Sequence, residues 1–391
     1  MSSSISSLKK HFQLDPKFTY LNHGSFGACP YPIFNEREKW QKKIEFQPVS
    51  FIQDDAIDSL EKSREALSSY IHCDKADVLY VPNPTTAMNM VIRSLDLKAG
   101  DEVLSSNHEY GAVERTWKFV ASKKGFSYKS IDIPLPFERQ DFLNRLKDSI
   151  NSNTKIIFLS HITSPTAIIF PIDEVCKLAK ELGIMTIIDG AHAPAQIDLN
   201  LNTLGADIYT GACHKWMLCP KGVAFLYASK TYQNILEPLV VSWGWDSDTP
   251  SHSQFLDYHQ YQGTNDISTY LTVPKAISFL NQHNWEEVRD YCHEKIIETR
   301  NILIETVATE PICRDEDLGQ MTSLKINIDN ADQLYRFLKI NNIEVPIFPW
   351  NGQNLLRVSF QCYNSFKNLS LIHISEPTRL LSLAGGVGGV K

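Results

Sequence analysis

The sequence predicts an α/β protein whose sheet is mostly parallel, and two observations support this prediction. Between about residues 77 and 230, apolar runs alternate with amphipathic stretches of helical period, which is typical of strand–helix–strand units. Several of these runs are continuously apolar, as expected for strands that are covered on both faces. After Ser242 this alternation ends, and the remainder predicts a smaller α+β unit.

The elements of the larger unit follow from these runs. The predicted strands are 77–81, 102–105, 127–133, 155–160, 184–188 and 223–227. The predicted helices between them include 87–95, 114–123 and 173–182. Because each helix connects one strand to the next, the sheet should carry helices on its faces.

The second unit begins after a loop, 243–266, that is rich in aromatic, His and Asp residues. A helix is predicted at 268–281, and a longer one follows with Trp285, Val288, Cys292 and Ile296 on one stripe. The remaining predictions are strand 323–328, helix 331–340, and strands 344–348 and 355–360. We therefore expect an N-terminal segment (1–40), a large domain (41–283) and a small C-terminal domain (284–370).

The last stretch, 371–391, does not continue this pattern. LIHISEPTRLLSLAGGVGGVK has no amphipathic period, and it stands where a further helix is expected after Tyr363-Asn364. It is similar to translated sequencing-adapter text, so we interpret it as an artefact that follows a genuine end near 369–371. The alternative is a flexible apolar tail.

Composition narrows the classes of function. The chain has 391 residues, 38 Lys and Arg against 45 Asp and Glu, and a net charge of −7. This mildly acidic balance argues against nucleic acid or an anionic membrane as the main partner. No apolar run approaches the roughly 20 residues that span a bilayer, and the N-terminus has no secretion-signal core. We expect a cytoplasmic protein with reduced thiols, since its eight cysteines form no CxxC pair.

Metal and nucleotide motifs are not found in the sequence. His293-Glu294 begins like the zinc motif HExxH, but Ile297 occupies the place of the second His. There is no GxxxxGK[ST], and no strand-anchored GxGxxG. We predict no metal site.

The most informative segments are IIDGAH (187–192) and GACHKW (211–216). Asp189 ends a predicted strand, and Lys215 follows 26 residues later. In open α/β sheets, ligands bind beyond the carboxyl ends of the strands. An Asp that pairs with a pyridinium nitrogen and a Lys that forms a Schiff base are what pyridoxal 5′-phosphate requires. An Asp at a strand end and a Lys in a loop are also common structural residues, so this spacing alone leaves both interpretations open.

Two further segments favour the cofactor interpretation. Asn83-Pro84-Thr85-Thr86 follows the first strand and opens a helix, where backbone N–H groups and hydroxyls form an anion site suited to a phosphate. An ordinary helix cap is the alternative. Tyr110 follows the next strand, where its ring could stack on a pyridine or simply be a partly buried aromatic residue.

The ordered set of motifs resembles the class V aminotransferase family of fold type I pyridoxal-phosphate enzymes. Within that family the chain is most similar to the branch of isopenicillin N epimerase-like proteins and hercynylcysteine sulfoxide lyases of ergothioneine biosynthesis. The resemblance covers about residues 16–370. Its motifs are YLNHGSFG (20–27), NPTTAMN (83–89), HEYGA (108–112), DGAHAP (189–194), HKW (214–216), GTND (263–266), and LRVS (356–359) with Tyr363-Asn364.

The resemblance implies a role for each cofactor residue. Lys215 would hold the cofactor, Asp189 its ring nitrogen and His192 its 3′-oxygen, and Tyr110 would stack on the ring. The phosphate would be held by Thr85, Thr86 and His214, with Gly263 and Thr264 from the other subunit of a homodimer.

It also implies residues for a small zwitterionic amino-acid substrate. Arg357 would bind the α-carboxylate, a task for a bidentate guanidinium. Asn22 and His23 would close over the substrate, although His23 could be an ordinary loop histidine. Trp243, with Trp245, Tyr258 and Tyr261, could cage a trimethylammonium group by cation–π attraction, or could pack in an interface.

The expected reaction is deprotonation of the substrate Cα by Lys215, followed by β-elimination from a cysteine-conjugate sulfoxide. Tyr110 could protonate a departing sulfur group or Cα, so it does not discriminate among elimination, epimerisation and transamination. Cysteine desulfuration ranks lower, because no Cys lies between Asn341 and Leu356 and Cys362 follows Arg357. An inactive or truncated cofactor-binding relative is a further alternative.

Overall fold

The computed structural model describes residues 5–328 and 330–365, and its centre is a seven-stranded sheet of order β2-β8-β7-β6-β5-β3-β4. β8 is antiparallel to β2 and β7, and the other neighbouring strands are parallel. The strands are β2 (Val78–Val81), β3 (Glu102–Ser106), β4 (Ser127–Ile131), β5 (Thr154–Ser160), β6 (Met185–Gly190), β7 (Ile208–Ala212) and β8 (Ala224–Ala228). The predicted α/β class is confirmed.

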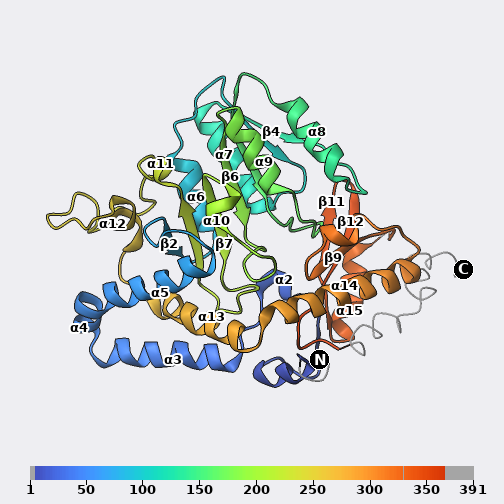
Figure 1. The fold of residues 1–391 in the computed structure, drawn as a ribbon. Coiled ribbons are helices and arrows are strands. Elements are labelled where there is room, and N and C mark those ends of the chain that lie inside the picture. The colour runs from blue at the N-terminus through green and yellow to red at the C-terminus, as the bar shows by residue number, and fades with distance from the viewer. Residues whose placement is uncertain (1–4, 329, 366–391) are drawn as a thin grey trace, which may run out of the picture.

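Helices cover the sheet on both faces (Figure 1), as its apolar strands require. Successive strand residues point to opposite faces, so Ile156 and Phe158 enter one buried cluster while Ile157 and Leu159 enter the other. The helices that follow the strands are α6 (Pro84–Ser94), α7 (Gly111–Lys124), α8 (Arg139–Ser149), α9 (Ile172–Glu181) and α10 (Leu201–Leu204).

Strand β7 was not predicted. Its sequence, IYTGA, has a mixed apolar and polar pattern, although every residue in it is buried. Gly211 is needed there, because a Cβ would lie 2.5 Å from the Phe225 ring and 2.7 Å from Pro194. The close packing of β7 comes from residues that are distant in the sequence, so the local sequence pattern did not indicate this strand.

The N-terminal part runs alongside the helices that precede the second unit. It contains η1 (Ser7–His11), β1 (Thr19–Tyr20), α2 (His23–Phe26), α3 (Tyr31–Phe46), α4 (Pro48–Ser50), η2 (Phe51–Asp55) and α5 (Ala56–Tyr70). After β8 come α11 (Lys230–Gln233), α12 (Gln254–Gln260), η3 (Ile267–Thr272) and α13 (Val273–Gln282). In Figure 1, α3, α5 and α13 lie side by side, and the segment around α12 projects from the body.

The C-terminal part has the predicted α+β character. It consists of α14 (Trp285–Val307), η4 (Asp315–Asp317), β9 (Met321–Ile326), α15 (Ala331–Ile340), β10 (Ile343–Glu344), β11 (Ile347–Trp350) and β12 (Gln353–Ser359). β11, β12 and β9 form an antiparallel sheet, and β10 pairs with β1 of the N-terminal segment. The predicted α14 stripe, Trp285 to Ile296, is buried.

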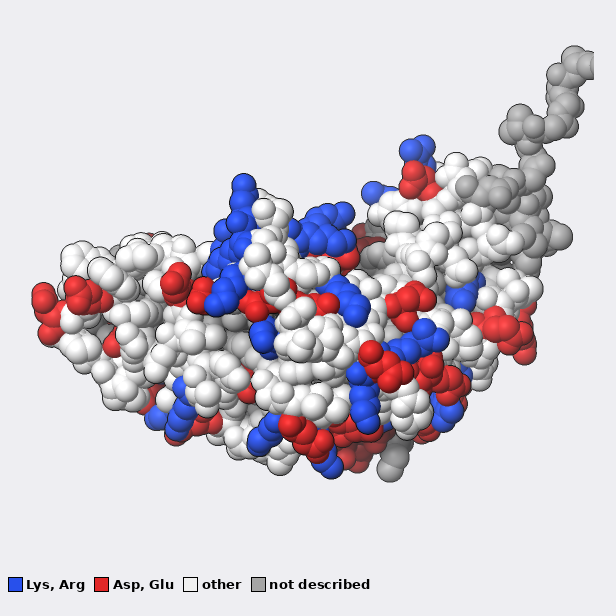
Figure 2. All heavy atoms as spheres, turned by 90° about the horizontal axis from the view of Figure 1, so that it is seen from above, with Lys and Arg blue, Asp and Glu red and all other residues white. Residues whose placement is uncertain are grey.

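The predicted boundary near 283 falls between α13 and α14, and the division into domains stays a prediction. The interpretation of 371–391 as an artefact concerns residues that lie outside the described part of the chain. Among the described helices, none has the length and apolar character that crossing a membrane requires. On the face shown in Figure 2, acidic and basic side chains are interspersed, so the net charge of −7 is not gathered into one patch there.

Candidate active site

A cavity of about 160 Å³ lies at the carboxyl ends of the parallel strands. Its wall brings together side chains from the N-terminal segment, the start of α6 and the ends of β5, β6 and β7. The lining residues are Ser25, Phe26, Asn83, Pro84, Thr85, Tyr110, Ser160, Ile162, Ser164, Asp189, Ala191, His192, His214 and Lys215. Six of the residues predicted for the site line this cavity: Thr85, Tyr110, Asp189, His192, His214 and Lys215. Arg357 does not line it but is hydrogen-bonded to Ser25 and Ser164 in its wall.

Lys215 follows β7, and its Nζ lies 3.1 Å from Nε2 of His192. Removal from water and the charge of Arg357 lower the pKa of Lys215 to about 7, although Asp189 acts in the opposite direction. A large fraction of this amine is therefore unprotonated near neutral pH. An unprotonated amine is the form that attacks a carbonyl and the form that accepts a proton.

His192 is held in a defined orientation next to that amine. The indole N–H of Trp216 donates to His192 Nδ1 at 3.4 Å, which places the ring proton on Nε2, facing Lys215. Burial and the charge of Lys215 hold the pKa of His192 well below its usual range. His192 is therefore a neutral donor inside the cavity.

Asp189 is the second-to-last residue of β6 and is 3% exposed. Its Oδ1 accepts the backbone N–H of Ala191 at 3.0 Å, while Oδ2 has no hydrogen bond within the described chain. Burial raises the pKa of this carboxyl, and the Ala191 N–H and Lys215 oppose that shift. Oδ2 is thus available to pair with a protonated ring nitrogen.

The start of α6 borders the cavity through Asn83, Pro84 and Thr85, and a helix start of this kind is suited to an anion. Asn83 caps the helix by accepting the N–H of Thr86 at 2.9 Å, and Pro84 occupies its first turn. The Thr86 hydroxyl also donates to Asn83, at 3.1 Å, and Thr86 does not line the cavity. His214 bonds to the Val223 carbonyl through Nδ1 at 3.1 Å, which leaves Nε2 for a ligand.

Arg357, on β12, reaches the cavity from the opposite unit and is 1% exposed. Its guanidinium donates to the Ser164 carbonyl at 2.6 Å and to the Ser25 hydroxyl at 3.0 Å, and it lies 4.9 Å above the Phe348 ring. Burial lowers its pKa to about 10, so it remains charged at neutral pH. A buried guanidinium without a carboxylate partner among the described residues is well suited to bind a substrate carboxylate.

Asn22 and His23 of the N-terminal segment were expected to close over the substrate, but they do not line the cavity. His23 is buried behind the lysine, with Nδ1 2.8 Å from the Tyr363 hydroxyl and Nε2 3.2 Å from the Lys215 carbonyl. Asn22 accepts the Ser25 hydroxyl at 2.5 Å. Ser25 and Phe26, rather than Asn22 and His23, face the cavity. The GSFG sequence could have indicated such a close approach, since Gly27 has φ +69° and lies against His214.

Like Thr86, Asn22 and His23, three further predicted site residues lie outside this cavity in the single chain. Trp243 is 85% exposed. The Thr264 hydroxyl lies 3.4 Å from the Tyr261 hydroxyl on an exposed loop, and Gly263 precedes it there with φ +103°. Their assigned roles stay predictions.

The cavity also contains residues that were not predicted. Ser160 is the last residue of β5 and pairs in register with Asp189 on β6, and Ser164 lies in the loop that follows β5. The one available signal was position, since residues at the carboxyl ends of parallel strands share an edge of the sheet. Taken together, the amine, the free carboxylate oxygen, the capped helix start and the guanidinium fit the functional groups of pyridoxal phosphate and an amino acid.

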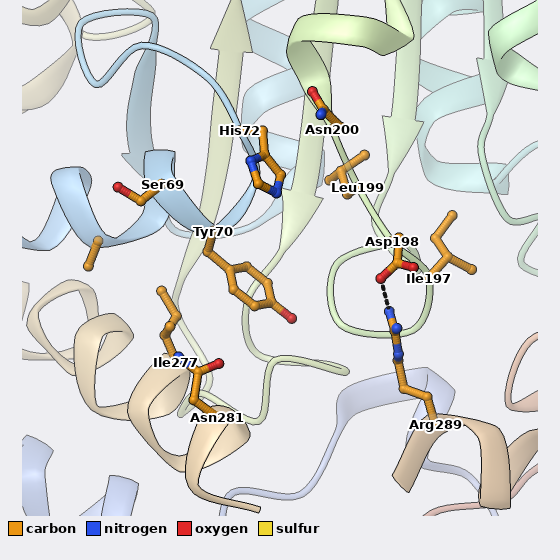
Figure 3. Close-up of a pocket in the computed structure, with 11 residues that line it drawn as sticks. Ser69, Tyr70, His72, Ile197, Asp198, Leu199, Asn200, Ile277, Asn281 and Arg289 are labelled. Atoms are coloured by element: carbon orange, nitrogen blue, oxygen red, sulfur yellow. Dashed lines mark hydrogen bonds and ion pairs between the residues drawn. The ribbon is translucent and has the colours of Figure 1, made fainter. Parts of the chain in front are cut away.

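A larger cavity, about 570 Å³, lies elsewhere and shares no lining residue with this one. Figure 3 shows Tyr70 and His72 on one side of it and the Asp198–Arg289 ion pair, 2.7 Å long, on the other. The pair joins the loop after β6 to α14. No lysine is among the residues that line this larger cavity, so none of them could hold the cofactor as a Schiff base.

Comparison with known proteins identifies the family. The family model described as Aminotransferase class-V matches residues 48–372. The isopenicillin N epimerase of Amycolatopsis lactamdurans is 30% identical over 382 residues, which cover 93% of this chain and 96% of that protein.

Two further relatives are named for reactions of L-cysteine and of hercynylcysteine sulfoxide. A probable chloroplastic L-cysteine desulfhydrase of Arabidopsis thaliana is 27% identical and covers 93% of this chain and 82% of that protein. The hercynylcysteine sulfoxide lyase of Schizosaccharomyces pombe is 25% identical and covers 77% of this chain and 78% of that protein.

Solved structures share the fold. The apo cysteine desulfurase of Thermococcus onnurineus NA1 has a TM-score of 0.81 at 16% identity, covering 97% of this chain and 98% of that chain. This likeness confirms the fold type expected from the sequence resemblance.

Proposed function

This chain belongs to the class V aminotransferase family, and we propose that it cleaves the C–S bond of a cysteine-conjugate sulfoxide by Cα deprotonation and β-elimination. Pyridoxal 5′-phosphate is its cofactor. The observation that carries the proposal is the position of the Lys215 amine. It shares a cavity with Asp189 and with Ser25, to which Arg357 is hydrogen-bonded. When bound, the cofactor supplies an electron-withdrawing ring that makes the proton on the substrate Cα acidic.

Each residue has a distinct task in this reaction. Asp189 Oδ2 would hold the proton on the ring nitrogen, and the helix start at Asn83, together with His214, would bind the phosphate. Arg357 binds the substrate α-carboxylate and so fixes the orientation of Cα. With the cofactor bound, His192 would donate its Nε2 proton to the ring oxygen, and Tyr110, 47% exposed at the start of α7, would stack on the ring.

Lys215 removes the Cα proton. The electron pair of the Cα–H bond forms a Cα=Cβ bond as the Cβ–S bond breaks, and the sulfur leaves with the electron pair of that bond. The departing sulfenate takes one proton, for which Tyr110 is the candidate donor. Hydrolysis of the three-carbon product yields pyruvate and ammonia. Two molecules of an added thiol reduce the sulfenic acid to a thiol, with release of water and formation of a disulfide from the two added thiols.

Hercynylcysteine sulfoxide is the proposed substrate, which places the reaction in ergothioneine biosynthesis. The Schizosaccharomyces pombe relative supports this choice, as does the aromatic segment around Trp243 and Trp245 that could hold a trimethylammonium group. A desulfurase reaction is disfavoured because Cys362 is buried and its thiol is not a mobile nucleophile, while 341–356 contains no Cys.

We further propose that the enzyme is a homodimer in which Gly263 and Thr264 complete the phosphate site of the partner. Exposed apolar residues on the segment leading to these positions support an interface: Val240, Val241, Trp243 and Trp245. Light scattering should give twice the chain mass. Thr264→Ala should weaken cofactor binding without changing that mass, whereas a monomeric active enzyme would contradict the proposal.

The test of the reaction is incubation of the cofactor-loaded enzyme with hercynylcysteine sulfoxide, followed by assay of pyruvate, ammonia and ergothioneine. Lys215→Ala is the control. Formation of none of the three products would overturn the lyase proposal.

Epimerisation is the second candidate, favoured by the 30% identical isopenicillin N epimerase. In D₂O an epimerase would place deuterium on Cα with inversion and release no pyruvate. Transamination would instead produce a keto acid that retains the sulfur group. An inactive relative would form none of these products, and absence of a Lys215-dependent cofactor absorbance band would favour this alternative by showing that the site is not assembled.

A further inference from the structure

Glu109 is a buried carboxylate beside the cavity to which the proposed reaction assigns no task. It is 8% exposed and lies between β3 and Tyr110. Its Oε1 accepts the Ser106 hydroxyl at 2.6 Å. Its Oε2 accepts both the backbone N–H of Ser160, at 2.8 Å, and the Ser160 hydroxyl, at 2.6 Å. All three contacts are short enough to be firm hydrogen bonds.

Ser160 connects this carboxylate to the cofactor site. It is the last residue of β5, it lines the cavity, and it is in register with Asp189 on the neighbouring strand β6. Residues in register on neighbouring parallel strands direct their side chains to the same face of the sheet. The Ser160 hydroxyl is therefore a neighbour of the carboxylate proposed to hold the ring nitrogen.

The position of one proton then matters. A serine hydroxyl has a single hydrogen, and in this structure it is directed to Glu109 Oε2. Ser160 can consequently only accept hydrogen bonds from the cavity, and it leaves Asp189 Oδ2 without a hydroxyl donor. Without the Glu109 acceptor, rotation about the Ser160 side chain would let this hydrogen turn toward Asp189. That bond would make Asp189 less basic and compete with a ring N–H for Oδ2.

We propose that Glu109 is a positioning residue that directs the Ser160 proton away from Asp189 and so keeps Oδ2 free for the cofactor ring nitrogen. The inference rests on the role of Asp189 in the proposed function. It depends on the acceptor atom of Glu109 and not on its charge. Burial raises the pKa of Glu109 to about 8, although the hydrogen bonds from Ser106 and Ser160 act in the opposite direction. A neutral Glu109 that is protonated on Oε1 still presents Oε2 as an acceptor to Ser160.

The test is the dissociation constant of pyridoxal 5′-phosphate for the purified chain, measured by absorbance titration for four variants. Glu109→Ala should weaken binding by about tenfold, the usual scale for one hydrogen bond to a charged group. Ser160→Ala and the double variant Glu109→Ala/Ser160→Ala should both bind within about threefold of the natural chain, because no hydroxyl is left to compete for Asp189. Glu109→Gln should also bind normally, because its amide oxygen accepts the same hydrogen.

Asp207 provides a matched control. Its Oδ2 accepts the Thr186 N–H at 2.8 Å and the Thr186 hydroxyl at 3.0 Å, the same arrangement at the opposite end of the sheet. Asp207→Ala should lower the melting temperature but leave cofactor affinity unchanged. If Glu109→Ala does not fold, Glu109→Met fills the volume without an acceptor and replaces it.

Three results would overturn the inference: normal binding by Glu109→Ala, a double variant as weak as Glu109→Ala, or a Glu109→Gln as weak as Glu109→Ala. The second would mean that Glu109 does not act through Ser160, and the third that its charge matters. Because the measurement needs no substrate, failure of the lyase proposal would leave these outcomes unaffected. Loss of cofactor binding in the natural chain itself would instead refute the proposed function.

Discussion

The Nζ of Lys215 lies 3.1 Å from Nε2 of His192, and the His192 ring is itself fixed by the indole N–H of Trp216. A neutral imidazole that donates to an amine holds that amine in its unprotonated form. Burial and the charge of Arg357 lower the pKa of Lys215, and the His192 contact orients the unprotonated amine, which can then act as a nucleophile and a base near neutral pH.

Cofactor attachment should depend on the protonation of Lys215. The pKa of this amine is lowered to about 7, so the amine is charged below that pH and reactive above it. The rate at which the cofactor absorbance band of the lysine-linked form appears should rise as pH increases through about 7. Lys215→Ala should lose the band and reduce C–S cleavage by about 10²–10⁴-fold, whereas Lys230→Met, an exposed lysine, should change neither. A pH-independent rate would contradict the prediction.

Arg357 should govern substrate binding through its paired N–H groups. Replacing it by Lys keeps a charge but loses the fork geometry. We expect Arg357→Lys and Arg357→Gln to raise KM by about 10–100-fold, corresponding to about 1.5–3 kcal/mol for a charge-assisted hydrogen bond. Steady-state kinetics on the sulfoxide substrate check this. An unchanged KM in both variants would show that the substrate carboxylate does not bind to Arg357.

Gly27 should be required for stability as well as for the site. It has φ +69°, and a Cβ there would lie 2.2 Å from the His214 carbonyl oxygen, so Ala would combine backbone strain with a backbone clash. Gly27→Ala should lower the free energy of unfolding by more than about 2 kcal/mol in urea titration. Gly100→Ala is the control, because Gly100 has φ +98° with nothing within 4 Å. Equal losses in the two variants would show that strain alone is responsible.

Glu109 should make stability depend on pH. Its pKa is raised from 4.5 to about 8, so the folded chain binds this proton more tightly than the unfolded chain does. The stability that comes from keeping Glu109 protonated in the folded chain is fully present below about pH 4.5 and is lost as pH rises through about 8. Across that window, the stability of the natural chain should fall relative to that of Glu109→Gln, which does not titrate. Parallel unfolding free energies of the two proteins from pH 5 to 8 would contradict this.

Much of the fold could be predicted because buried strands and amphipathic helices have characteristic local patterns. Helix 331–340 was predicted with the bounds that it has as α15, whereas β7 was missed because its burial comes from neighbours and not from its own composition. The predicted strand at 344–348 became β10 and β11, because its first residues pair with β1 and its last with β12. Pairing partners of that kind are distant in the chain.

The site shows the same division. Asp189, His192 and Lys215 could be proposed from the sequence because residue type, strand ends and the ordered motifs indicated them. Their neighbours could not, because a hydrogen bond such as that between Glu109 and Ser160 joins positions 51 apart.

By itself, then, the sequence determined the α/β class, the family resemblance and the residue types of the cofactor site, since these depend on local pattern. Only the tertiary structure decided that His23 lies behind Lys215 and that Ser25 faces the cavity. It also decided that Arg357 reaches the site from the second unit, bonded to Ser25 across 332 positions. The physical reason is that protonation and hydrogen-bond direction depend on distances and burial, which arise only when remote segments pack together.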